Sequence, residues 1–131
     1  MNPDTPSHSH ADETLREPDR EERGDREVTY VWDLGPDPDG GTRQTVLTVS
    51  HHRHARGGAF SATILNRTQD GPVTSMGDIT TWLRFAAQPT ARYSKRGLDA
   101  FAAGALHQLK DKYQGEDDES RLLQGYFQAQ P

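Results

Sequence analysis

The strongest fold signal in the chain is Val28-Thr-Tyr-Val-Trp-Asp-Leu34, in which apolar and polar side chains alternate. A period of two predicts a β-strand that buries one of its faces. Residues 35–41 are rich in Gly, Pro and Asp and predict a turn. Residues 42–50 alternate in the same way, so we expect them to pair with the first strand as a hairpin with a long loop.

Residues 59–66 predict a third strand, and the segment that follows them is ambiguous. After a turn at 67–72, residues 73–87 fit two short strands, Val73 to Met76 and Ile79 to Phe85, around a two-residue turn at Gly77-Asp78. The β-branched and aromatic side chains of 79–85 favour this hairpin. The alternative is a helix, because apolar residues recur at 79, 82, 83 and 86.

The last regular element is a helix that begins after Ser94, a good N-cap residue. From there, apolar side chains recur at helical spacing up to Gly115, which is expected to end the helix. The predicted fold class is α+β: an antiparallel β-meander of four to five strands, covered on one face by a C-terminal α-helix. The helical stripe consists of Leu98, Phe101, Ala102, Ala105, Leu109 and Tyr113.

The composition differs along the 131 residues. Residues 1–27 hold three hydrophobic residues, nine acids and four arginines, so burial cannot offset their conformational entropy. Residues 28–113 carry seven acids and ten Lys or Arg, a net charge of +3, although the whole chain has −5. We predict a disordered acidic tail over 1–26, a single α+β domain over 27–114, and an acidic and apolar tail over 115–131.

Several classes of protein are excluded by absent features. The chain has no cysteine, which excludes disulfide scaffolds and thiolate chemistry. No apolar run is long enough to cross a membrane, and no secretory signal opens the chain. We therefore expect a cytoplasmic protein with no membrane partner. We also find no nucleophile elbow, phosphate-binding loop or dinucleotide glycine pattern, and do not expect an enzyme.

Two basic segments are candidate contacts for an anion or a nucleic acid. One is the loop 51–58, and the other is the start of the last helix at 92–96, where free N–H groups favour phosphate. Residues 94–96 and the alanines after them resemble the last helix of double-stranded-RNA-binding domains, although that family's first helix has no counterpart here. In a five-strand meander the two segments lie at opposite ends, whereas a strand and a helix over 73–87 would let them meet. The candidate residues are His51, His52, Arg53, His54, Arg56, Arg92, Lys95 and Arg96.

The same loop also contains a possible metal-binding pair. In extended backbone His52 and His54 point to one side, and neutral imidazoles bind zinc, nickel or iron. No Asp or Glu follows at ligand spacing, so we expect neither a metal site nor a cofactor. A metal-dependent enzyme that uses this pair is a remote alternative.

The C-terminal segment is a candidate for docking to a partner. Acidic residues 116–119 precede a short apolar cluster, an arrangement that suits a helix lying in the groove of another protein. Packing of the segment on its own domain, or on a second copy in a dimer, is equally compatible with the pattern. The cluster consists of Leu122, Leu123, Tyr126 and Phe127.

Our leading hypothesis is a small non-catalytic interaction or regulatory module. It would bind an unknown protein partner, or itself as a homodimer, through an exposed sheet face or edge together with the 120–127 segment. The alternative is a nucleic-acid-binding accessory protein that uses the two basic segments.

Overall fold

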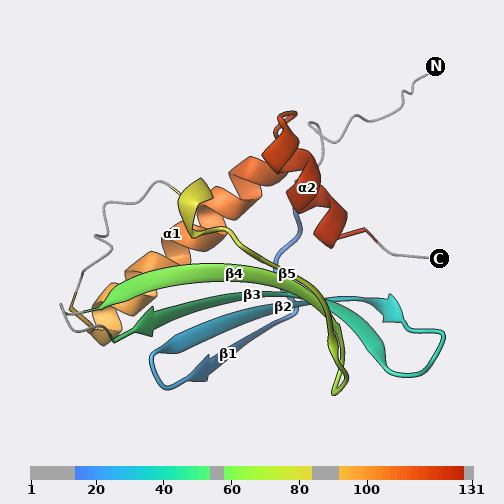
Figure 1. Cartoon of the computed structure of the whole chain (residues 1–131), viewed down its shortest axis with the longest axis horizontal. Coiled ribbons are helices and arrows are strands. Elements are labelled where there is room, and N and C mark those ends of the chain that lie inside the picture. Colours follow the sequence, from blue (N-terminus) through green and yellow to red (C-terminus); the bar gives the residue numbers. More distant parts are fainter. Residues whose placement is uncertain (1–13, 54–57, 84–91, 129–131) are drawn as a thin grey trace.

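The computed structural model describes residues 14–53, 58–83 and 92–128, which form a five-stranded antiparallel sheet and two helices. The strands pair in chain order, so the sheet is a meander with β1 and β5 at its edges. Both helices lie on the same side of the sheet (Figure 1). The predicted α+β meander with a C-terminal helical layer is confirmed. The strands are β1 (Arg20–Gly24), β2 (Glu27–Pro36), β3 (Thr42–His52), β4 (Ala59–Thr68) and β5 (Val73–Asp78), and the helices are α1 (Lys95–Tyr113) and α2 (Asp118–Tyr126).

The alternation along β2, β3 and β4 sets which face of the sheet is buried. Tyr30 lies opposite Leu47, and Leu47 lies opposite Ile64, so one apolar row crosses three strands. These side chains are buried against the helices. Because side chains alternate along a strand, the neighbouring positions form a second face, which neither α1 nor α2 covers (Figure 1). That open face carries Val31 and Val46, both buried within the sheet by their neighbours.

Helix α1 begins where the sequence predicts. The hydroxyl of Ser94 accepts a hydrogen bond from the N–H of Gly97 at 2.9 Å, which is the expected N-cap contact. The predicted stripe from Leu98 to Leu109 is buried on the sheet. Helix α2 starts after Asp117, whose carboxylate accepts from the N–H of Ser120 at 2.8 Å. Within the described ranges, no helix combines the length and the apolar character needed to cross a membrane.

The prediction of a disordered tail over 1–26 is wrong for residues 14–26; residues 1–13 lie outside the described residues. Leu15 is buried in the core, and β1 pairs along β2 from Arg20↔Val31 to Gly24↔Glu27. The small number of hydrophobic residues predicted disorder, but β1 is held by main-chain pairing and by charge contacts instead of by apolar burial. One of these contacts is the ion pair between Arg23 and Asp99 of α1, at 2.5 Å.

The favoured hairpin over 73–87 is also corrected. Its first arm exists as β5, but the chain turns after Asp78 into a short 3-10 helix at Thr80–Trp82. The carboxylate of Asp78 accepts from both the N–H and the hydroxyl of Thr80, at 2.9 and 2.6 Å, and this local turn ends the strand. Residues 84–91 lie outside the described residues. The sheet still has five strands, because β1, which the sequence did not predict, takes the place of the strand expected over 79–85.

Candidate functional site

The two predicted basic segments meet at one end of the molecule. Tyr93, just before α1, lies with its ring centroid 5.4 Å from that of His51 at the end of β3. The guanidinium of Arg26, in the turn between β1 and β2, lies 4.6 Å from the centroid of the Tyr93 ring. The start of α1 and the ends of β2 and β3 thus share one surface (Figure 1). We call this surface the basic end; the basic residues in or next to these contacting segments of the chain are Arg26, Arg53, Arg92, Lys95 and Arg96.

His51 does not belong to that exposed surface, which corrects its prediction as an anion contact. Its ring is buried and packs edge-on to Phe60 at 4.8 Å between centroids. Two features place it there: β3 continues to His52, and Gly58 has a φ of 125°. A Cβ on Gly58 would stand 2.5 Å from Cε1 of His51, so only glycine lets the chain pass so close to the ring.

His52 lies on the opposite, open face of the sheet. Its Nε2 is 3.1 Å from the hydroxyl of Ser50 and 2.9 Å from the hydroxyl of Ser61. Its predicted metal partner His54 lies outside the described residues, as does Arg56. Among the side chains that the structure describes, no three His, Asp or Glu gather closely enough to hold a metal ion.

Three of the four predicted docking residues pack on the chain's own domain. Leu123 is fully buried, and the ring of Phe127 lies edge-on to Trp32 with centroids 5.1 Å apart. The carbonyl of Tyr126 accepts from the amide of Asn66 at 2.8 Å and from the hydroxyl of Thr45. Leu122 remains, with 58% of its surface exposed. The segment is thus mainly a structural part of the helical layer.

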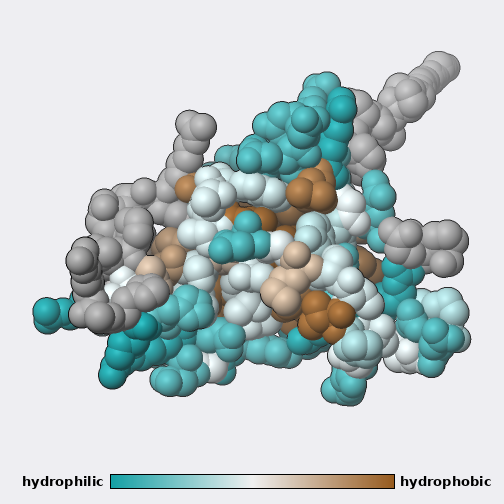
Figure 2. All heavy atoms as spheres, viewed as in Figure 1, coloured by the Kyte–Doolittle hydropathy of each residue, from teal (hydrophilic) through white to brown (hydrophobic). Residues whose placement is uncertain are grey.

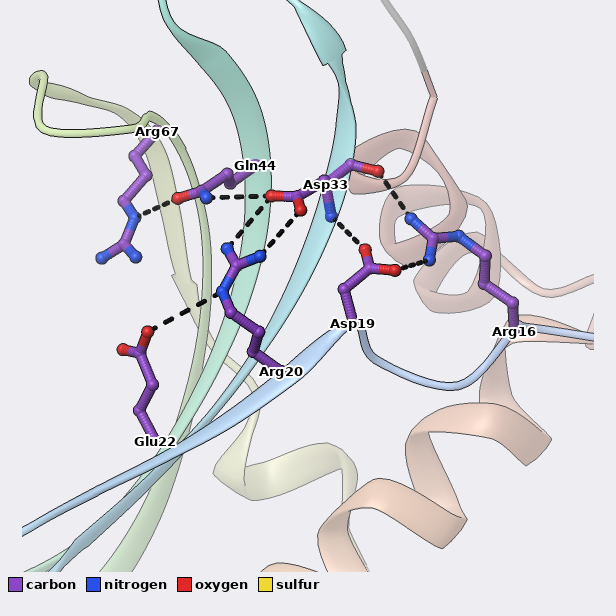
Figure 3. A network of polar contacts seen from close by, with 7 residues as sticks. All are labelled: Arg16, Asp19, Arg20, Glu22, Asp33, Gln44 and Arg67. Atoms are coloured by element: carbon purple, nitrogen blue, oxygen red, sulfur yellow. Dashed lines mark hydrogen bonds and ion pairs between the residues drawn. The ribbon is translucent and has the colours of Figure 1, made fainter.

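Charged and polar side chains tie four strands together on the open face (Figure 3). Arg20 donates to both carboxylate oxygens of Asp33, at 2.8 and 3.1 Å. Gln44 donates to the same carboxylate at 3.0 Å and accepts from Nε of Arg67 at 2.9 Å. The hydrogen bonds from Arg20, and then from Gln44, hold the pKa of Asp33 below its ordinary value.

This network borders a hollow of about 320 Å³. Its charged lining includes Arg20 and Arg67, but also Glu22 and Asp70. Charges of both signs therefore face the hollow, and Arg20 is already bonded to Asp33. The network stabilises the sheet, and the hollow does not select an ion of one sign.

The two edge strands differ in chemistry. In β1, four of the five residues are charged, with the sequence REERG. In β5, VTSMGD, the one charged residue is Asp78 at its end, and five of the six residues are exposed. A charged edge strand resists the addition of another strand, whereas an uncharged exposed edge invites it.

Exposed apolar side chains occur on β5 and on α2. The large hydrophobic residues described as exposed are Val73 at 47%, Met76 at 62% and Leu122 at 58%. The first two belong to β5. Leu122 stands one turn before Tyr126, whose hydroxyl lies beside Gly77 of β5. Figure 2 shows apolar atoms over the regions where β5 and α2 run in Figure 1.

Sequence reasoning missed β5 as an edge. It identified the strand but expected 79–85 to pair with its outer side. The available signal was Asp78 followed by Thr80, a pair that favours a local turn over a continuing strand.

Comparison of the chain with protein-family models, with curated proteins and with solved structures gave no match. The function is therefore argued from the surfaces themselves.

Proposed function

We propose that this protein is a small non-catalytic interaction module that binds an extended polypeptide at the outer edge of β5. The supporting observation is that Val73 and Met76, two of the three large apolar residues described as exposed, both belong to this one edge strand. An exposed sheet edge binds a peptide by continuing the main-chain hydrogen bonds of the sheet. The flanking side chains then determine which peptide is accepted.

The peptide groups available for such binding follow from the register of β4 and β5. The N–H of Ile79 donates to the carbonyl of Ala62 at 2.9 Å, which makes them a hydrogen-bonded pair. In an antiparallel ladder, alternate residues turn their peptide groups toward the partner strand. Gly77 and Ser75 therefore face β4. Met76 and Asp78 present their N–H and C=O groups outward. The alternation stops at Thr74, which lies in a β-bulge and donates its hydroxyl to the carbonyl of Asn66 at 3.3 Å.

Selection from a displayed library of random peptides tests this proposal. Selected peptides are titrated into ¹⁵N-labelled protein, and the largest amide shifts are expected at Met76 and Asp78. Met76→Lys should weaken binding about tenfold, since a lysine opposes strand addition at an edge. Glu22→Lys on the opposite edge changes the charge by more and serves as the control; it should leave binding unchanged. Peptides that shift only amides away from β5 would show the proposal to be wrong.

A second candidate function, polyanion binding, is favoured by the basic end. Lys95 and Arg96 occupy the first turn of α1, which holds no acidic residue. Positive charges there oppose the helix dipole, so they do not stabilise the helix. Acidic residues also lie near this end: Asp25 and Glu27 flank Arg26, and Asp99 of α1 is paired with Arg23.

Binding to a fluorescent oligonucleotide over a salt series tests the second candidate. Affinity should fall steeply as salt rises, because phosphate contacts release counterions. Lys95→Glu should reduce the affinity, while Arg121→Glu, an equal charge change on α2, should not. Equal effects of the two variants would mean that only net charge matters, and would reject a site at the basic end.

A further inference from the structure

We infer that the polypeptide accepted at the β5 edge pairs antiparallel with β5 and carries an apolar residue opposite Met76 and a basic residue opposite Asp78. Because the two strands run in opposite directions, the basic residue comes two positions before the apolar one in the peptide. This inference rests on the proposed function and names the class of peptide that the same edge selects.

An apolar row crosses four strands on the open face of the sheet and ends at Met76. Residues that lie opposite each other in adjacent antiparallel strands share a face, so their side chains are direct neighbours. Val31 and Val46 are buried, whereas 62% of the surface of Met76 is exposed. An apolar side chain opposite Met76 would extend the row by one strand and cover its exposed end. The row consists of Val31, Val46, Leu65 and Met76.

The opposite end of the apolar row is closed. Arg20 of β1 lies opposite Val31, and its guanidinium donates to the carboxylate of Asp33 at 2.8 Å. A strand added beyond β1 would meet the charged sequence REERG. The apolar row can therefore be extended at the β5 edge but not at the β1 edge.

The neighbouring row on the same face is polar and has a carboxylate at each end, Glu22 in β1 and Asp78 in β5. A charge of opposite sign stabilises a cross-strand pair, and a like charge destabilises it. A basic residue is therefore favoured opposite Asp78, and an acidic one is disfavoured. Between the two carboxylates lie Thr29, Thr48 and Thr63.

The carboxylate of Asp78 still has an oxygen available for this pairing. The N–H and the hydroxyl of Thr80 both donate to Oδ1, at 2.9 and 2.6 Å. Among the described residues, no hydrogen bond or ion pair reaches Oδ2, so it can accept from an incoming Lys or Arg. The net charge of −5 on the whole chain also favours a basic partner over an acidic one.

The order of the two residues in the peptide follows from the direction of pairing. Every strand pair of the sheet is antiparallel, and antiparallel pairing is slightly more stable per residue than parallel pairing. In an antiparallel pair, the residue opposite Asp78 precedes the residue opposite Met76 by two positions. The residue between them points to the other face of the sheet, so it is not part of either row.

The sequences of the peptides selected from a random library test this inference. Among the peptides whose binding shifts the amides of Met76 and Asp78, a Lys or Arg two positions before a large apolar residue should recur. Replacing this basic residue by Glu should weaken binding about fivefold, and replacing the apolar residue by Ser should weaken it about tenfold. Recurrence of the reverse order, with the apolar residue first, would overturn the antiparallel arrangement.

One variant of the full-length protein tests the role of the Asp78 carboxylate. Asp78→Asn removes the charge and keeps an oxygen that can accept from Thr80, so the turn after β5 should persist. The preference for the basic peptide over its Glu counterpart should fall from about fivefold to about twofold or less. Glu22→Gln removes the same charge at the other end of the polar row and should leave the preference unchanged. Equal changes in the two variants would mean that only net charge matters, and would overturn the pairing with Asp78.

The outcomes separate this inference from the proposed function. If selected peptides bind at β5 but show no pattern of basic and apolar residues, the stated selectivity is wrong and the interaction module stands. If no selected peptide binds at β5, both are wrong.

Discussion

Leu123 offers the sharpest test that the C-terminal segment is part of the fold. Its side chain is fully buried, while the neighbouring Leu122 is 58% exposed. Removing a buried leucine side chain costs about 2–5 kcal/mol, because apolar contact is lost and a cavity remains. Since α2 lies at the surface and can partly collapse, we expect about 3 kcal/mol for Leu123→Ala. At about 4 °C per kcal/mol for a domain of this size, Tm should fall by about 12 °C.

Urea denaturation followed by tryptophan fluorescence measures this loss, because Phe127 of the same segment packs against Trp32. Leu122→Ala is the control in the same helix and should change stability by less than about 0.5 kcal/mol. Equal effects of the two substitutions, or a loss below about 1 kcal/mol for Leu123→Ala, would refute the packing of α2 on the sheet.

Two further predictions concern the start of α2 and the turn near His51. Hydrogen bonds from the Ser120 hydroxyl and N–H, and then from Lys112, lower the pKa of Asp117 from 3.8 to about 2. The ionised Asp117 carboxylate therefore stabilises the fold fully above its ordinary pKa, and this stabilisation disappears as the pH falls toward 2. Asp117→Asn keeps the cap but cannot titrate, so its unfolding free energy should fall less across this interval; identical pH curves would contradict the assignment. Gly58→Ala should destabilise the protein more than Gly40→Ala, by about 1–3 kcal/mol in thermal or urea unfolding, because both have positive φ but only at Gly58 would the new Cβ meet His51. Equal losses of unfolding free energy for the two variants would show that residue 58 is not in close contact with the His51 ring.

The elements that the sequence predicted correctly are those whose signal is local. Alternation in 28–34 follows directly from one buried face, and Ser94 with the stripe from Leu98 to Leu109 defines α1 by spacing alone. These patterns need no knowledge of the rest of the chain.

The elements that it missed depend on contacts between distant residues. Strand β1 has no apolar period, and its ion pair to Asp99 joins positions 76 residues apart. The burial of His51 depends on Gly58 and Tyr93, which come from two other segments. The 120–127 pattern permitted packing or docking equally, and only the position of α2 over β4 separates Leu123 from Leu122.

The position of the exposed sheet edge was predicted only in part, because it too depends on contacts outside the local sequence. An exposed sheet edge was expected, but which strand forms it depended on where the chain turns after Asp78. The meeting of the two basic segments depended on the same turn.

Amide hydrogen exchange at the β5 edge, measured by NMR with and without a selected peptide, tests the central claim most directly. In the free protein the outward amides of Met76 and Asp78 should exchange quickly, because water reaches them. When the peptide binds, the exchange of these two amides should slow, while the edge amides of β1 stay unchanged. Exchange at β5 that the peptide leaves unchanged, or protection that develops at β1 instead, would contradict binding at the β5 edge.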